Sequence, residues 1–111
     1  MNLTVALVEP LYEVNVGHIA RIMANFGYTR LILVNPKVNL NKARKFASHG
    51  VYLLDNAEIC AFEDLKKFDY KIGTTAIFDV STTNVLRSTV SPRFMADAIK
   101  KFSGSVCLIF G

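Results

Sequence analysis

A short segment near the N-terminus combines an amide, a glycine and a guanidinium at spacings that suit an anion site. Asn15, Gly17 and Arg21 follow an apolar run that Glu9 and Pro10 close. Glycine in the first helical turn lets a backbone or a ligand approach closely, and a guanidinium near the same end of the helix binds a phosphate through two parallel hydrogen bonds. The same residues also suit a helix N-cap, a close packing contact and a surface arginine, so spacing alone leaves both interpretations open.

The second candidate site is a basic cluster around a short predicted helix. Its members are Lys37, Lys42, Arg44 and Lys45. The chain has 13 Lys and Arg against 9 Asp and Glu, a net charge of +4 that permits a nucleic-acid partner without identifying one. The cluster would follow the phosphates of an RNA, or it would form an ordinary solvated helix face.

The remaining reactive side chains form no recognisable catalytic pattern in the sequence. His18, His49, Cys60 and Cys107 have neither the spacing of metal ligands nor that of a nucleophile triad, so no metal site is predicted. We interpret the histidines as surface or packing residues and the cysteines as small apolar groups. Two cysteines, no signal-peptide pattern and no apolar run near the roughly 18 residues of a membrane span predict a cytoplasmic protein without membrane association.

Strand-like and helix-like segments alternate along the chain and would position these candidates. The predicted strands are 4–8, 31–34, 51–54, 70–75 and 106–110; the predicted helices are 16–26, 41–48, 62–67 and 92–102; residues 77–90 form a predicted loop. We expect Asn15 to cap the first helix and Gly27 to end it. The second helix is expected to bury Ala43, Phe46 and Ala47.

Apolar strands without polar alternation predict an α/β domain, a Rossmann-like parallel sheet with helices on both faces. The 111 residues, 51% of them hydrophobic, suit one such domain. Ligands of open parallel sheets bind outside the carboxyl ends of the strands. Any site is therefore expected at residues 9–10, 35–36, 73–75 and 110–111.

The order of these segments resembles the SpoU branch of the SPOUT RNA methyltransferases, and within it the TrmJ-like subgroup. Asn15, Gly17, Arg21 and Gly27 match the first family motif, Asn-x-Gly-x-x-x-Arg with a glycine that closes the helix. Three further stretches match in order: residues 31–36 resemble the second strand, 73–76 the Gly-Thr-Ser/Thr-Ala turn, and 108–111 the start of the second signature motif. The resemblance covers essentially the whole chain.

The resemblance implies that the parent protein methylates the ribose 2′-hydroxyl of RNA with S-adenosyl-L-methionine (AdoMet) and no metal. The implied RNA is tRNA, modified in the anticodon loop, with rRNA as the weaker alternative, and the implied assembly is a homodimer. The implied catalytic residue is Arg21 with Asn15 beside it, and the implied AdoMet-binding positions are Thr74, Thr75, Ala76 and Gly111. Because arginine stays protonated, we interpret Arg21 as a phosphate clamp that stabilises oxyanion charge rather than as a base.

The family pattern continues after the second motif with a further strand and a third motif that together form a trefoil knot. Residues 1–111 contain no such segment, so we expect a SpoU-type domain truncated after the second motif and inactive alone. The alternative is a non-catalytic RNA- or nucleotide-binding α/β module. The lack of Gly-x-Gly-x-x-Gly after the first strand argues against a dinucleotide ligand.

Overall fold

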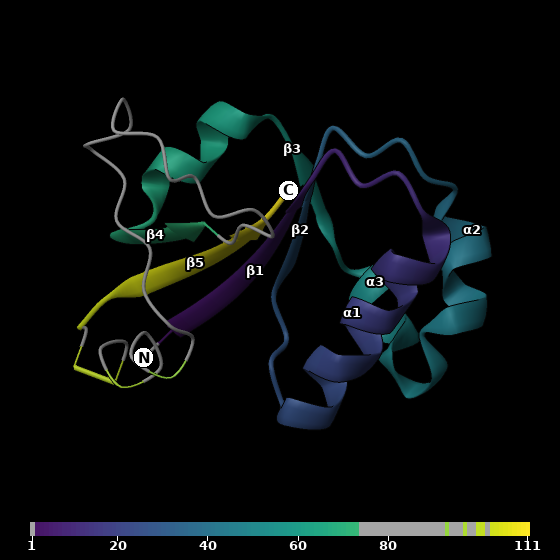
Figure 1. Cartoon of the computed structure of the whole chain (residues 1–111), viewed down its shortest axis with the longest axis horizontal. Coiled ribbons are helices and arrows are strands. Elements are labelled where there is room, and N and C mark those ends of the chain that lie inside the picture. The colour runs from purple at the N-terminus through teal and green to yellow at the C-terminus, as the bar shows by residue number, and fades with distance from the viewer. Residues whose placement is uncertain (1, 74–92, 94–96, 98–99, 102) are drawn as a thin grey trace.

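A parallel five-stranded sheet forms the centre of the computed structural model, which describes residues 2–73, 93, 97, 100–101 and 103–111 (Figure 1). The strands are β1 (Asn2–Val8), β2 (Leu31–Val34), β3 (Glu58–Cys60), β4 (Tyr70–Gly73) and β5 (Ser105–Phe110). Their order is β3-β2-β1-β5-β4, and every neighbouring pair is parallel. The predicted parallel α/β class is therefore confirmed.

Among the described residues, helical segments lie on both faces of this sheet. On one face lie α1 (Glu13–Phe26), α2 (Leu40–Ala43) and α3 (Val51–Asp55), with the 3-10 turns η1 (Arg44–Phe46) and η2 (Ser48–Gly50) between α2 and α3 (Figure 1). The 3-10 segment η3 (Phe62–Lys67) lies on the other face, where Leu65 packs with Ile32.

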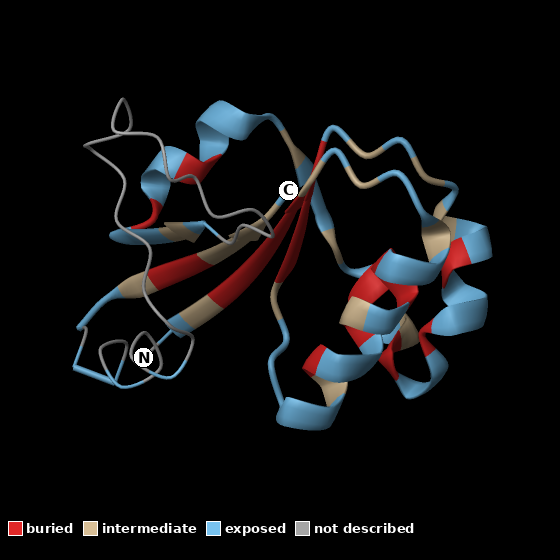
Figure 2. Ribbon diagram, in the orientation of Figure 1, coloured by how far each residue is buried: buried red, intermediate tan, exposed pale blue. Residues whose placement is uncertain are grey.

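Successive residues of β1 and β2 point into different cores. Leu7 and Leu33 pack against α1, whereas Ala6 and Ile32 face Leu65. Figure 2 shows the resulting band of buried residues along the central strands. Burial on both faces explains why these strands contain continuous apolar runs.

α1 and the η1–η2 segment pack so closely that the glycines between them leave no room for a side chain. A Cβ atom on Gly17 would lie 2.5 Å from the Ala43 carbonyl oxygen and 2.6 Å from the Cβ of Phe46. A Cβ atom on Gly50 would lie 2.4 Å from the Ala20 carbonyl oxygen. Of the two sequence-based roles for Gly17, close approach of another backbone is therefore the observed one.

The prediction of a strand at 51–54 was wrong, because these residues form α3 and the third strand is β3, which the sequence analysis missed. A short apolar run suits a buried strand and a buried helix equally, and here Leu53 and Leu54 fill the core under α1. The β3 residues are mostly exposed at the sheet edge, so they lack a strong apolar pattern.

Three helix predictions need correction at their ends or in their type. α1 begins at Glu13 with Tyr12 as its N-cap residue, so Asn15 lies inside the first turn and is not the cap. Gly27 ends this helix in the left-handed conformation, as predicted. The predicted helix 41–48 is divided among α2, η1 and η2, and 62–67 is a 3-10 helix.

Other predictions fall outside the described residues. The turn at 74–76, the loop at 77–90 and most of the helix at 92–102 belong to this group. Within the last segment, Arg93 and Asp97 are described and are helical.

A polar clamp joins the starts of β4 and β5. The Asp69 carboxylate accepts hydrogen bonds from the Ser105 backbone N–H at 2.9 Å and from the Ser105 hydroxyl at 3.2 Å. The Asp69 backbone N–H donates to the same hydroxyl oxygen at 3.0 Å. These bonds lie just before the first backbone pair of β4 and β5, Tyr70 with Val106, and hold the two strands in this register.

We expect Asp69→Ala to lower the free energy of unfolding by about 1–2 kcal/mol, because two hydrogen bonds to a charged acceptor are lost. Urea unfolding followed by circular dichroism measures this difference. Glu63→Ala, which removes an exposed carboxylate on η3, is the control and should stay within about 0.5 kcal/mol of the parent chain. Equal midpoints for the two variants would contradict the clamp.

We expect Gly17→Ala to destabilise the chain by about 1–3 kcal/mol, since the added methyl group meets a backbone oxygen that cannot swing away. The matched control is Gly73→Ala, where a Cβ atom would meet no described residue within 4 Å. Thermal unfolding of both variants should separate them clearly. If Gly17→Ala melted no lower than Gly73→Ala, close backbone packing would not be the role of Gly17.

Candidate functional site at the carboxyl ends of β1 and β5

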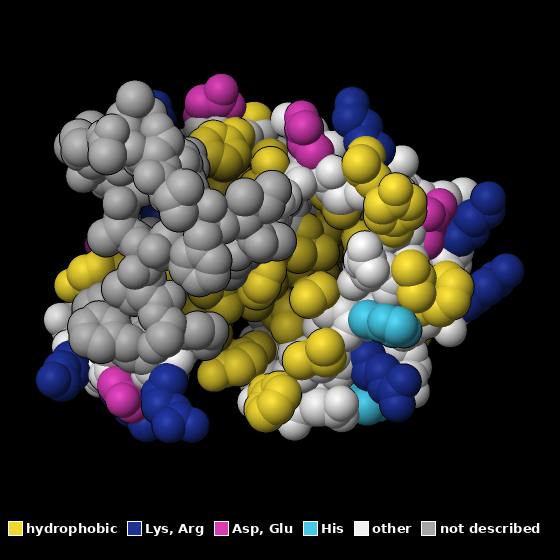
Figure 3. Space-filling view, viewed as in Figure 1, with side chains coloured by type: hydrophobic (Ala, Val, Ile, Leu, Met, Phe, Trp, Pro, Cys, Tyr) yellow, Lys and Arg dark blue, Asp and Glu magenta, His cyan; other side chains and the backbone are white. Residues whose placement is uncertain are grey.

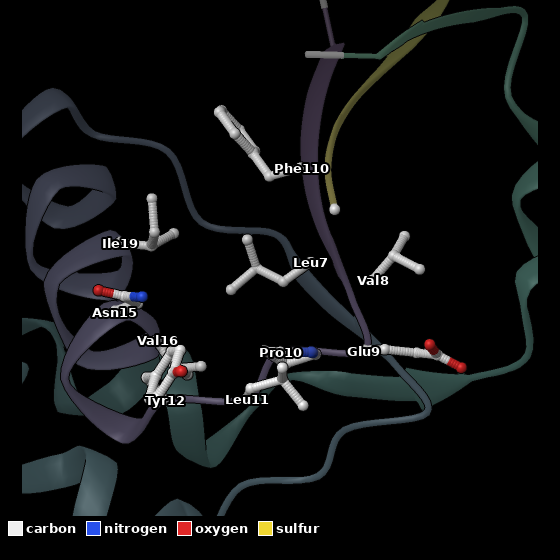
Figure 4. A pocket seen from close by; sticks show the side chains of 11 residues that line it. Leu7, Val8, Glu9, Pro10, Leu11, Tyr12, Asn15, Val16, Ile19 and Phe110 are labelled. Atoms are coloured by element: carbon white, nitrogen blue, oxygen red, sulfur yellow. The ribbon is translucent and has the colours of Figure 1, made fainter. Parts of the chain in front are cut away.

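A pocket of about 420 Å³ opens where β1 and β5 end (Figure 4). This volume lies within the usual range for small-molecule sites. The residues that line the pocket come from the end of β1, the following loop, the first turns of α1 and the end of β5: Leu7, Val8, Glu9, Pro10, Leu11, Tyr12, Asn15, Val16, Ile19, Phe110 and Gly111.

The position of the pocket follows from the topology of the sheet. From β1 the chain passes through α1 to β2 on one side, whereas β5, on the other side of β1, is the neighbour of β4. The strand order therefore reverses between β1 and β5. Open parallel sheets bind ligands at the carboxyl ends of the strands beside such a reversal.

The pocket combines an apolar wall with a few polar groups. In Figure 4, Phe110 and Ile19 lie beside Leu7, and the Asn15 amide projects from α1 near them. The Glu9 carboxylate points away from Asn15 in the same view. An apolar wall of this kind accepts a flat ring or an aliphatic chain, and an amide both donates and accepts hydrogen bonds.

Two left-handed residues follow β1 and β2, and the first of them, Glu9, lines the pocket. Glu9 has φ +47° and Asn35 has φ +45°, and each follows a strand and precedes a proline. The Glu9 N–H donates to the Val34 carbonyl at 2.8 Å, and the Lys37 N–H donates to the Pro10 carbonyl at 3.2 Å. Such backbone conformations are uncommon outside glycine and persist where surrounding bonds hold them, so the rim is a fixed element of the site.

The structure brings only some of the predicted site residues together. Asn15 and Gly111 both line the pocket, whereas Arg21 does not. Arg21 follows Asn15 by about 9 Å along α1 and by roughly 120° around it, and it is exposed on the outer side of the helix. Thr74, Thr75 and Ala76 lie outside the described residues.

The four basic candidates are exposed on the α2 side of the pocket. Arg44 forms an ion pair with Asp55, so its charge is already balanced locally. Within the part of the chain that the structure describes, no ion pair engages Lys37, Lys42 or Lys45. These three lysines are therefore the members of the cluster best able to meet an anion.

The histidines and cysteines do not form a reactive centre among the described residues, which contain no group of three potential metal ligands. The His18 ring stands edge-on to the Phe46 ring, with 6.2 Å between centroids. Burial raises the pKa of the Cys107 thiol, and burial together with the nearby Asp64 carboxylate raises the pKa of Cys60. Both thiols therefore stay protonated near neutral pH, which makes them poor nucleophiles.

The described helices are all too short or too polar to cross a membrane.

Comparison with known proteins identifies the family to which this arrangement belongs. The family model of the SpoU rRNA methylases matches residues 2–111. The chain is 35% identical over 112 residues to the tRNA (cytidine-2′-O-)-methyltransferase TrmJ of Methanocaldococcus jannaschii, covering 98% of this chain and 48% of that protein. The corresponding protein of Sulfolobus acidocaldarius is 32% identical over 114 residues, covering 100% of this chain and 47% of the relative.

A solved structure gives the same result for the fold. A "probable methylase family protein" from Haemophilus influenzae Rd KW20 superimposes with a TM-score of 0.86 at 25% identity, covering 99% of this chain and 45% of that one. The chain thus spans about half the length of the curated relatives that it matches. The family match over residues 2–111 confirms the predicted resemblance, and the chain belongs to the SpoU rRNA methylase family.

Proposed function

We propose that the protein containing these residues is an AdoMet-dependent 2′-O-methyltransferase of RNA, with tRNA as its substrate. The observation that carries the proposal is the pocket at the β1–β5 reversal, which Asn15 and Gly111 of the two family motifs line together. Two relatives whose names specify 2′-O-methylation of cytidine in tRNA support the choice of tRNA and of the ribose hydroxyl. On the family resemblance, we also propose that the modified nucleotide lies in the anticodon loop and that the protein is a homodimer.

The residues of the pocket fit AdoMet. Leu7, Ile19 and Phe110 offer an apolar wall to the adenosyl group, and Asn15 offers an amide to its polar edges. A Cβ atom on Gly111 would meet only Val8, at 3.5 Å, so packing within the described chain does not require glycine there. AdoMet supplies an electrophilic methyl group on a sulfonium. By resemblance, Thr74, Thr75 and Ala76 would complete this site.

In the proposed reaction, Arg21 aligns the RNA, and neither Arg21 nor Asn15 exchanges a proton with it. The 2′-oxygen would take the methyl group as the carbon–sulfur bond breaks, S-adenosylhomocysteine would leave, and the 2′-hydroxyl proton would pass to solvent water. The exposed Arg21 guanidinium would hold the phosphate next to the target ribose through paired hydrogen bonds. Holding that phosphate fixes the 2′-oxygen for in-line attack, and fixed alignment is the main contribution that such a transfer requires from a protein. The permanent charge of arginine would also stabilise the alkoxide as it develops.

The second candidate function is RNA or nucleotide binding without catalysis. The exposed Lys37, Lys42 and Lys45, which have no ion-pair partner among the described residues, favour this alternative. For residues 1–111 alone we expect weak AdoMet binding and no methyl transfer. Isothermal calorimetry on the 111-residue chain would show tight AdoMet binding if this expectation were wrong.

In the full-length protein we expect Arg21→Ala to lower methyl transfer to tRNA roughly 100-fold or more, the usual effect of removing one stabilising donor. AdoMet affinity should change less than about twofold, because Arg21 does not line the pocket. Transfer of tritiated methyl groups and calorimetry measure the two quantities. Lys66→Ala, an exposed change on η3, is the control, and wild-type turnover of Arg21→Ala would remove Arg21 from the mechanism.

Gly111→Val is expected to weaken AdoMet binding, whereas Arg21→Ala is expected to leave it nearly unchanged. We expect AdoMet affinity in the full-length protein to fall at least about tenfold, because a branched side chain would occupy the ligand side of the pocket. In the 111-residue chain the melting temperature without AdoMet should stay close to that of the parent, since among the described residues only Val8 lies near the added side chain. Unchanged AdoMet affinity would place the cofactor elsewhere.

A further inference from the structure

The outer side of α1 carries an exposed aromatic and cationic surface that the pocket does not use. Along the helix, His18 follows the pocket residue Asn15 by one turn, and Arg21 follows His18 by another, so neighbouring pairs share a surface. Phe46 of η1 lies against His18, with ring centroids 6.2 Å apart and planes at 88°. We call His18, Arg21, Lys45 and Phe46 the α1–η1 surface.

This surface is held by the backbone and not by its own side chains. The contact of Gly17 with Ala43 and Phe46 places η1 directly against α1. Phe46 was expected in the core, yet 40% of it is exposed, so its ring is presented to solvent from a fixed base. A single exposed phenylalanine is ordinary, but here it lies against the His18 ring and directly follows Lys45 in the chain.

The charge of the surface is uncompensated. Arg44 next to Lys45 pairs with Asp55, whereas no ion pair engages Arg21 or Lys45 in the described part of the chain. Figure 3 shows histidine side chains beside Lys and Arg side chains and exposed apolar groups on the face in view. A polyanion whose repeating unit also offers a flat ring would match this arrangement.

We propose that the α1–η1 surface binds an unpaired segment of RNA, with one base stacked on one of the two perpendicular rings of Phe46 and His18 and in edge contact with the other, and with its flanking phosphates on Arg21 and Lys45. In a duplex the faces of the bases are already stacked, so only an unpaired base can meet these rings. This inference rests on the proposed function and deepens it, because the RNA would pass over α1 from the pocket rim at Asn15.

The test measures binding of the 111-residue chain to a single-stranded RNA dodecamer that carries one 2-aminopurine. Phe46→Leu keeps apolar volume at η1 but removes the ring, and His18→Ala removes the second ring from an exposed position. Each should weaken binding roughly tenfold, the effect of losing one stacked base, and should reduce the quenching of 2-aminopurine on binding. His18→Phe should restore affinity and quenching.

Phe62→Leu is the matched control, because Phe62 is an aromatic residue of η3 that is 55% exposed. Its affinity should equal that of the parent. Wild-type affinity for Phe46→Leu and His18→Ala overturns the proposal. Two other results would overturn it. One is that the variants lose as much affinity for an RNA duplex as for the single strand; the other is that they change self-association, measured by sedimentation, and leave RNA affinity unchanged.

Circular dichroism reports whether Phe46→Leu folds. If Phe46→Leu does not fold, the RNA affinity of His18→Ala alone tests the proposal. Failure of the proposed function is a separate result. If the full-length protein transfers no methyl group while these variants still weaken RNA binding, the α1–η1 surface stands without the enzyme activity.

Discussion

The close contact between α1 and the η1–η2 segment determines how this domain presents its candidate functional groups. Gly17 and Gly50 allow backbone-to-backbone packing on two successive turns of α1, and this contact fixes the rotation of the helix. With that rotation, Asn15 faces the pocket and Arg21 faces solvent. A wider separation would free the helix to turn and would disconnect the first family motif from the end of β5.

The sheet supplies the second constraint. β1 is buried on both faces, pairs with β2 and β5, and is followed by the left-handed residue Glu9, whose N–H is bonded to β2. The rim of the pocket is therefore tied to the most buried part of the molecule. Rigid strands with a shaped loop at their carboxyl ends are the usual support for small-molecule sites in α/β domains.

The sequence predicted those features that depend on apolar patterning and on motif order. Continuous apolar runs identified β1, β2 and β5, and Gly27 marked the end of α1. The run at 51–54 was misassigned because periodicity does not distinguish a short buried helix from a strand. Phe46 was expected inside because helical spacing was extended through η1, where the backbone departs from an α-helix and exposes the ring. Asparagine is enriched at positive φ, so the residue type of Asn35 is compatible with its conformation, whereas glutamate gives no such signal for Glu9, whose N–H is bonded to the Val34 carbonyl.

Methylation of the ribose of tRNA by the full-length protein is the proposed activity. The most direct measurement is alkaline hydrolysis of tRNA labelled by the full-length protein with tritiated AdoMet. A 2′-O-methyl group prevents alkaline cleavage of the 3′-phosphodiester of the same nucleotide. We therefore expect tritium in an alkali-resistant dinucleotide. Tritium in a mononucleotide would place the methyl group on a base, and unlabelled tRNA from a folded, AdoMet-bound protein would contradict the account altogether.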